Sequence, residues 1–440
     1  MRIKTRGFLG VLLALYSAIS FAVPTIQHWQ TANGVKVYFV PTDGLPIIDA
    51  QLVFKAGSAY DKKQLGVAAL TSALLDQGAN GLTAQQIAEQ LENVGAHLST
   101  STSRDFSAIS FRSLTDKKVL KKSWETLTQV LNKPDFNLAD VQREKKQTLL
   151  AIKGREESPG IIAQLALYQQ MYKKHPYANP IQGLNKTVEA IKVSDVKAFY
   201  QTNYVAKKLV VVMVGGISRQ KAEKLVDTLV SHLKPGVAAM PLPAVSKLGK
   251  AVFVHKDYPS QQTHLMYALP VMANNDPDYF ALTVGNHILG GSGFSSRIVK
   301  EIREKRGLAY SAYSYFHPMV QQGPFIMGLQ TRNEKVAEAI KATKKTLHSF
   351  IEEGPTEEEL KAAKNNITGG FALRLDSNKK LLANVAGLVN SGLPLDYLNT
   401  YIENIKTVSI KQIIDAFQRR VVQDNMVMVT VGQPLSVSGQ

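Results

Sequence analysis

Cysteine is absent from this chain of 440 residues. Its absence excludes disulfide scaffolds, thiolate metal sites, cysteine nucleophiles and lipid anchoring through an N-terminal cysteine. Hydrophobic residues make up 45% of the chain and charged residues 20%, a balance that is typical of globular proteins and excludes disordered or fibrous architectures. The chain is long enough to bury more than one core.

Acidic residues are few compared with basic ones. Lys and Arg total 52 against 35 for Asp and Glu, so the formal charge is +17. A basic surface favours acidic partners, including anionic membranes and acidic peptides. No helical segment combines clustered Lys and Arg with interleaved aromatic residues, and we therefore expect no nucleic-acid partner.

Long apolar runs are also absent beyond the N-terminus, so we expect no transmembrane segment. Three basic residues lie in the first six positions, Phe8–Ile19 is a short apolar run, and small residues follow at Ser20 and Ala22. This pattern predicts a secretory signal peptide over residues 1–22, because the run is too short for a comfortable membrane span; an N-terminal anchor is the alternative. Removing three basic residues leaves +14 on the mature chain. We expect export across the inner membrane into the periplasm of a Gram-negative bacterium.

The chain contains an internal repeat with a period of about 215 residues. In both halves a serine that can cap a helix is followed by a β-branched run, which predicts a buried strand ending at glycine. These segments are 190–196 and 209–215 in the first half, and 404–410 and 426–432 in the second. Because their order and spacing agree, we interpret the repeat as a duplication rather than chance similarity.

The repeat predicts two domains of similar construction. Residues 236–250 lack hydrophobic patterning and contain two prolines, which is typical of a linker. We therefore place the domains at 23–235 and 251–440. Capping boxes at Thr83–Gln86 and Thr356–Glu359 predict one helix start in each half. Strands and helices do not alternate strictly, which favours an α+β fold with a largely antiparallel sheet in each half.

The nine histidines form no metal motif. No two of them are three, four or five residues apart, so no helical turn presents a histidine pair, and neither HExxH nor HxxEH occurs. The serine-hydrolase elbow G-x-S-x-G, the P-loop and the dinucleotide fingerprint are absent too. Gly290–Gly293 is rich in glycine but lacks the lysine of a phosphate loop.

One segment, Leu289–Tyr310, carries a pair of hydrogen-bond donors. Either of two adjacent serines can cap a helix there, and Gly307 predicts its end. Arg303 then lies in the last helical turn and Tyr310 just beyond it. A guanidinium and a phenol so placed could converge on one carbonyl oxygen and stabilise an oxyanion. The alternative is that Arg303 pairs with a surface carboxylate and Tyr310 packs on the sheet.

This segment resembles the C-terminal domain of the M16 peptidases, the pitrilysin and mitochondrial-processing-peptidase family. Arg303 and Tyr310 match the family's spacing of six residues between its arginine and tyrosine, and His175–Gly183 is similar to another family segment in the first domain. The resemblance covers nearly the whole mature chain. It implies two α/β-sandwich halves that face each other across a cavity.

The family's zinc motif, His-x-x-Glu-His, would fall where this chain has Ala69, Ser72 and Ala73. The family's third ligand, a glutamate 77 residues after the second histidine, would fall at Leu150. Alanine and leucine cannot bind zinc, and serine cannot perform the glutamate's proton transfer at neutral pH. The resemblance therefore implies a degenerate zinc site and no cofactor in this chain.

The resemblance also implies a partner. In the family, some members place the zinc ligands and the Arg/Tyr pair on separate chains. We expect this chain to be the noncatalytic subunit of a heterodimeric secreted zinc peptidase. It would lend Arg303 and Tyr310 to an HxxEH-containing, zinc-bearing subunit that cleaves extended peptides. The alternatives are a peptide-binding or scaffold protein of the same fold with no role in proteolysis, and an active metalloendopeptidase with a rearranged site.

Overall fold

The computed structural model describes residues 25–434. The predicted signal peptide, residues 1–22, lies outside this range. No helix among the described residues is both long and apolar enough to cross a membrane.

The first half of the chain forms a six-stranded sheet in the order β1-β2-β8-β3-β7-β6. All neighbours are antiparallel except β2 and β8. The predicted β-branched strand is the buried β8. The strands are β1 (Gln27–Gln30), β2 (Lys36–Pro41), β3 (Ile47–Phe54), β6 (His97–Thr102), β7 (Ser107–Leu114) and β8 (Leu209–Gly215), with a separate small pair, β4 (Gly78–Ala79) and β5 (Leu82–Thr83).

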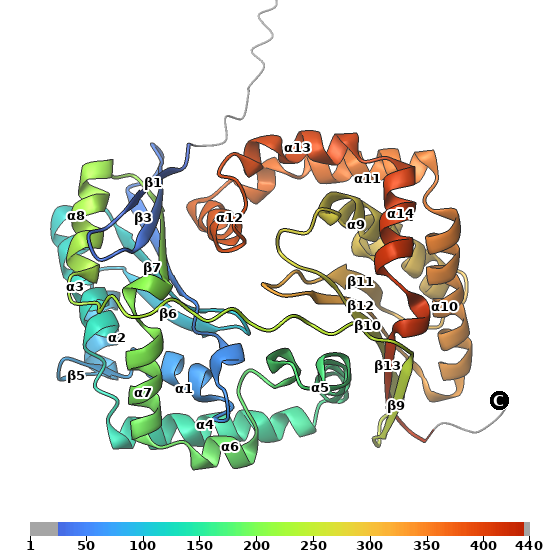
Figure 1. Ribbon diagram of the computed structural model, residues 1–440, viewed down its shortest axis with the longest axis horizontal. Helices are drawn as coiled ribbons and strands as arrows, with labels where there is room; N and C mark the ends of the chain where they lie inside the picture. Colours follow the sequence, from blue (N-terminus) through green and yellow to red (C-terminus); the bar gives the residue numbers. More distant parts are fainter. Residues whose placement is uncertain (1–24, 435–440) are drawn as a thin grey trace, which may run out of the picture.

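Eight helices come from the first half, and α3 and α8 pack against one face of its sheet (Figure 1). Helix α2 begins at the predicted capping box, in which Thr83 and Gln86 bond each other's backbone N–H groups. The helices are α1 (Val67–Ala73), α2 (Ala84–Glu92), α3 (Lys117–Asn132), α4 (Leu138–Glu156), α5 (Pro159–Tyr172), α6 (Asn185–Ala190), α7 (Val193–Asn203) and α8 (Arg219–Val230).

The second half repeats this plan with five strands in the order β11-β12-β10-β13-β9. Only β13 and β9 are parallel, so the predicted α+β class with antiparallel-rich sheets is confirmed. The elements are β9 (Val252–Asp257), β10 (Gln262–Met272), β11 (Ala312–Phe316), β12 (Gly323–Arg332) and β13 (Val427–Gly432), with α9 (Tyr279–Asn286), α10 (Val336–Glu353), α11 (Glu357–Gly369), α12 (Asn378–Asn390), α13 (Tyr397–Thr407) and α14 (Ile410–Arg420).

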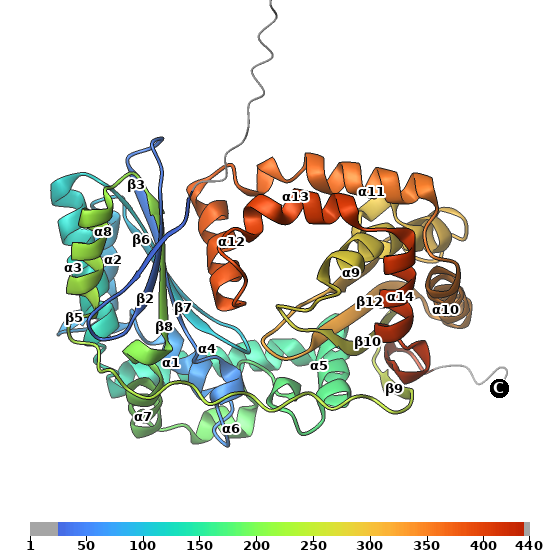
Figure 2. The same cartoon turned by 45° about the horizontal axis from the view of Figure 1, so that its top comes forward.

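The two halves exchange one helix each. Helix α5, from the first half, packs against β10 and β13, whereas α12, from the second half, packs against β3 and β8. Figures 1 and 2 show α12 beside the first sheet and α5 against the second. One continuous apolar cluster joins Leu167 of α5 and Val385 of α12 to Val212 of β8. The halves therefore share a core instead of meeting through a surface.

Polar contacts reinforce this junction at the β11–β12 turn. The buried carboxylate of Asp105 accepts hydrogen bonds from the Tyr177 hydroxyl and from the backbone N–H of Val320. The Tyr177 hydroxyl in turn accepts from the Gln321 N–H at 3.1 Å. Because a buried carboxylate needs such partners, these bonds fix the turn of the second half on the first.

The segment between α8 and β9 contains no regular secondary structure. It is nevertheless held in place, because Leu242 and Leu248 are buried and the Gln321 side-chain amide donates to the Leu242 carbonyl at 3.1 Å. The segment that connects the halves is thus fixed to the surface by buried side chains and a hydrogen bond, although it has no regular secondary structure.

The shared core predicts coupled unfolding of the two halves. Replacing the fully buried Leu167 with alanine should cost about 2–5 kcal/mol of unfolding free energy. Both tryptophans, Trp29 and Trp124, lie in the first half. In urea titrations, tryptophan fluorescence should shift together with far-UV circular dichroism.

Leu150→Ala is the matched control, because Leu150 is 69% exposed and its loss should change stability by no more than about 0.5 kcal/mol. A fluorescence midpoint that stays fixed while the dichroism midpoint falls would show that the halves unfold independently.

Candidate functional site

Helix α1 carries three of the positions predicted as a degenerate zinc site. It begins after Gly66, whose φ of +95° lies in the left-handed region. The buried carboxylate of Asp61 accepts hydrogen bonds from the N–H groups of Gly66 (2.7 Å) and Ala68 (2.9 Å). Burial outweighs these two bonds and raises the pKa of Asp61 to about 7. The start of α1 is therefore fixed by backbone geometry and one capping carboxyl.

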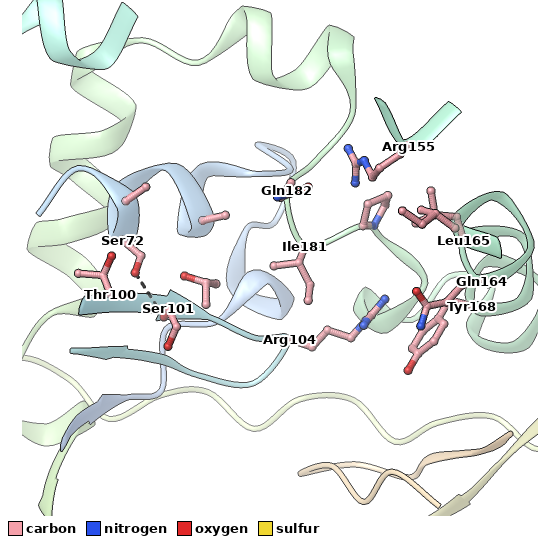
Figure 3. A pocket seen from close by; sticks show the side chains of 15 residues that line it. Ser72, Thr100, Ser101, Arg104, Arg155, Gln164, Leu165, Tyr168, Ile181 and Gln182 are labelled. Carbon is pink, nitrogen blue, oxygen red and sulfur yellow. Dashed lines mark hydrogen bonds between the residues drawn. The ribbon is translucent and has the colours of Figure 1, made fainter. Parts of the chain in front are cut away.

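The cavity beside α1 brings together Ala69, Ser72 and Ala73. Its volume is about 490 Å³, and Figure 3 shows Ser72 facing β6, where its hydroxyl donates to the Ser101 carbonyl at 3.3 Å. Ser72 is thus engaged in holding α1 to β6. The remaining walls are Thr100, Thr102, Arg104, Arg155, Ile161, Gln164, Leu165, Tyr168, Pro180, Ile181 and Gln182.

The chemistry of this cavity does not fit zinc. Its lining contains no histidine, cysteine or carboxylate, which are the groups that hold zinc in proteins. Across residues 25–434, no group of three such side chains is arranged to hold a metal ion. The three positions predicted to match the zinc motif, Ala69, Ser72 and Ala73, supply only two methyl groups and a hydroxyl.

Leu150 lies apart from the other three predicted positions. It is on the outer side of α4, 69% exposed, and does not line the cavity. The lining residue from α4 is Arg155, five residues later and on a different side of the helix. A count of 77 residues along the chain therefore reaches an outward-facing side chain of α4 and not the one that faces the cavity.

Arg303 and Tyr310 do come together. Arg303 lies in the last turn of a helix that is π-helical over Val299–Glu304, and the chain leaves this helix at Gly307, where φ is +58°. The guanidinium carbon of Arg303 lies 4.8 Å from the centroid of the Tyr310 ring and 4.7 Å from that of Phe294. The arginine is therefore held between two aromatic rings.

The charges around Arg303 leave it without a carboxylate. Glu301 accepts from Lys305 at 2.5 Å and from Arg306 at 2.6 Å, and none of the ion pairs within residues 25–434 includes Arg303. Tyr310 is 83% exposed. Both donor groups are therefore available to a molecule that approaches from outside the chain, and the alternative of a surface ion pair for Arg303 is not observed.

Phe294 was not anticipated from the sequence. It is 70% exposed in a glycine- and serine-rich loop, where no core requires an aromatic side chain. A large apolar residue among Gly and Ser, a few positions before a cationic helix, is the signal that could have indicated a stacking partner.

Edge strands border the cavities on both sides. β6 pairs only with β7, and β11 pairs only with β12, so each has one row of backbone groups without a strand partner. Ser311, next to Tyr310, and Tyr313 line a second cavity of about 380 Å³, which shares Ile161 and Gln164 with the cavity beside α1. The start of β11 is thus connected through α5 to the cavity beside α1.

Comparisons with known proteins agree with this architecture. The family description "Insulinase (Peptidase family M16)" matches residues 43–184, and "Peptidase M16 inactive domain" matches residues 190–367. The crystal structure of a peptidase M16 inactive domain from Pseudomonas fluorescens is 34% identical, covers 94% of this chain and 99% of that one, and superposes with a TM-score of 0.91.

Relatives known from sequence carry two kinds of name. A protein of Helicobacter pylori called "Non-peptidase homolog YmxG" is 29% identical over 411 residues, which are 92% of this chain and 93% of that protein. A Rickettsia felis protein called "Uncharacterized zinc protease" is 26% identical over 334 residues, or 75% and 79% of the two chains. On the strength of the two matched domains and the fold, the chain belongs to the M16 peptidase family, and it is similar to members described as inactive or non-peptidase homologues.

Proposed function

We propose that this protein is the noncatalytic subunit of a heterodimeric, secreted M16-type zinc peptidase. The observation that carries the proposal is a contrast within one chain. The α1 positions predicted to match the zinc motif hold side chains that cannot bind metal. In contrast, Tyr310 is exposed and in contact with a partly exposed Arg303 that pairs with no described carboxylate. Such a chain has kept the donors that stabilise an oxyanion and lacks the metal that generates it.

The partner supplies what this chain lacks. An HxxEH-bearing M16 subunit would hold zinc, polarise the scissile carbonyl and activate water, with its glutamate as general base. Arg303 would donate guanidinium N–H groups and Tyr310 its phenolic O–H to the oxygen that becomes negative in the tetrahedral intermediate. Export to the periplasm, predicted from residues 1–22, would bring both subunits to the same compartment.

The substrate class follows from the edge strands. An extended peptide adds to an exposed strand through main-chain hydrogen bonds, which give affinity with little sequence preference. β6 and β11 offer such edges beside the cavities. The cavities would admit unfolded segments and exclude folded domains.

The proposal predicts that the purified chain binds no zinc. Metal analysis should find much less than one equivalent, and a chelator should leave the thermal unfolding temperature unchanged, because a ligand that does not bind the native state cannot stabilise it. The zinc-bearing subunit is the positive control. One tightly held equivalent of zinc in this chain, with chelator-sensitive peptidase activity, would favour the active enzyme with a rearranged site.

Mixing the two subunits tests the division of labour. Peptidase activity should appear only in the mixture, and Tyr310→Phe or Arg303→Ala should lower kcat about 10²–10³-fold, the usual cost of one oxyanion donor. Arg306→Ala is the matched control, since Arg306 lies on the same helix end and pairs with Glu301. Full activity with both variants would instead support a peptide-binding or scaffold role.

A further inference from the structure

The cavity beside α1 has the opposite charge to a metal site. Its lining contains two arginines, Arg104 and Arg155, and no acidic side chain. A zinc site places anions and neutral imidazoles around a cation. This cavity places two cations around an empty space, and the charge of the group that would fit it is therefore negative.

Arg104 is held in position by its neighbours. It lies in the turn between β6 and β7, its Nε donates to the Tyr177 carbonyl at 2.9 Å, and its guanidinium carbon lies 3.8 Å from the centroid of the Tyr168 ring. The stacked ring and the single hydrogen bond orient the side chain. Its two terminal nitrogens make no hydrogen bond to another described residue, and they are the groups that bind a carboxylate in a two-pronged manner.

Arg155 enters the cavity from the last turn of α4. One terminal nitrogen donates to the Gly183 carbonyl at 3.1 Å, while its Nε is buried and has no hydrogen-bond partner among the described residues. Desolvation lowers the pKa of both guanidinium groups from the usual value. Arginine nevertheless remains charged at neutral pH, so each is a partly buried cation that forms no ion pair with a described carboxylate.

The neighbouring carboxylates attract the two guanidiniums but form no ion pair with them. Asp105 and Glu156 follow the two arginines in the chain, yet no ion pair within 4.0 Å joins a described carboxylate to either guanidinium. Asp105 instead binds Tyr177 and Val320.

The two ends of the cavity differ in their side chains, as Figure 3 shows: one end carries hydroxyl groups and the other carries the arginines. Ser72, Thr100 and Ser101 lie at one end, and Arg104, Arg155, Gln164 and Tyr168 lie at the other, with Ile181 and Leu165 on either side of the cationic end. The cavity also shares Ser101, Thr102, Arg104 and Ile181 with a cavity of about 500 Å³ between the two halves. An extended segment lying along the β6 edge would therefore pass the cationic end.

We propose that the cationic end of this cavity binds the carboxylate of an extended peptide, with Arg104 and Arg155 as the recognising groups. The peptide as ligand rests on the proposed function; the preference for a carboxylate rests on the two arginines. The carboxylate would take the terminal N–H donors of Arg104 and those of the Arg155 terminal nitrogen that does not bond Gly183. The overall positive charge would increase the rate at which acidic peptides arrive.

The test uses the purified chain without a partner subunit. Fluorescence anisotropy compares three short N-terminally labelled peptides of Ser, Thr and Val: one with a free C-terminal carboxylate, one with a C-terminal amide, and one with the amide and a central glutamate. Arg155→Gln keeps most of the side chain's packing and removes the charge. It should weaken binding of at least one carboxylate peptide about tenfold or more, the loss expected for one charge-assisted contact, and leave the neutral peptide unchanged.

Arg104→Lys should act in the same direction, because an ammonium lacks the planar fork. Arg143→Gln is the matched control, since Arg143 lies on the same helix, pairs with Asp140 and does not line the cavity. Thermal unfolding establishes that each variant is folded. Loss confined to the first peptide identifies the terminal carboxylate as the source, and loss confined to the third identifies a side-chain carboxylate.

The proposal is overturned if carboxylate and neutral peptides bind equally, if Arg155→Gln weakens them all to the same extent, or if no peptide binds. Because this assay involves no partner and no catalysis, its result is separate from that of the mixing experiment. If the chain binds carboxylate peptides but the mixture has no peptidase activity, the proposal for Arg104 and Arg155 stands and the catalytic role of Arg303 and Tyr310 is rejected.

Discussion

The apolar core shared by the two halves is the constraint on which the other features depend. Because α5 packs on β10 and β13, and α12 packs on β3 and β8, each sheet is covered in part by a helix from the other half. Burying the largely apolar α5 between the halves holds β11 beside the α4–α5 corner, where two connected cavities meet. A domain boundary made of surface contacts would permit hinge motion between the halves. A common core opposes that motion and keeps the relative positions of the cavities fixed.

The cavity beside α1 retains its shape although its side chains cannot bind metal. The start of α1 is fixed by the left-handed conformation of Gly66 and by the hydrogen bonds that the Asp61 carboxylate accepts. Neither residue is one of the three α1 positions predicted to match the zinc motif. Gly183, with φ of +76°, lies against Leu65 so closely that a Cβ would be 2.3 Å from the Leu65 carbonyl oxygen. The walls of the cavity therefore do not depend on the side chains at Ala69, Ser72 and Ala73. The cavity so formed, with two arginines and no acidic side chain in its lining, suits an anionic ligand better than a metal cation.

Sequence patterns predicted those features that depend on neighbouring residues. The β-branched run became β8, both capping boxes begin helices, and Gly307 ends the helix that carries Arg303. The sequence shows directly that Ala69, Ser72 and Ala73 have no zinc-binding side chain; that they occupy the positions of the family's zinc motif stays a prediction from the resemblance. The exchange of α5 and α12 could not, because an apolar helix does not specify which sheet will cover it. Arg104 and Arg155 are 51 positions apart, and only the folded structure reveals that they line the same cavity.

The exposure of Tyr310 beside Arg303 is consistent with the proposal that another subunit covers this pair. A cation between aromatic rings in water contributes about 0.5–1 kcal/mol, so stability alone gives little reason for this arrangement. Hydrogen-bond donors aimed at an oxyanion are worth about 2.7–4 kcal/mol, but only where water is excluded. With Tyr310 83% exposed, the isolated chain does not provide that environment. The partner subunit proposed above would lower the local dielectric around both donors where it covers them, and the proposed contribution of the pair to catalysis would then depend on assembly.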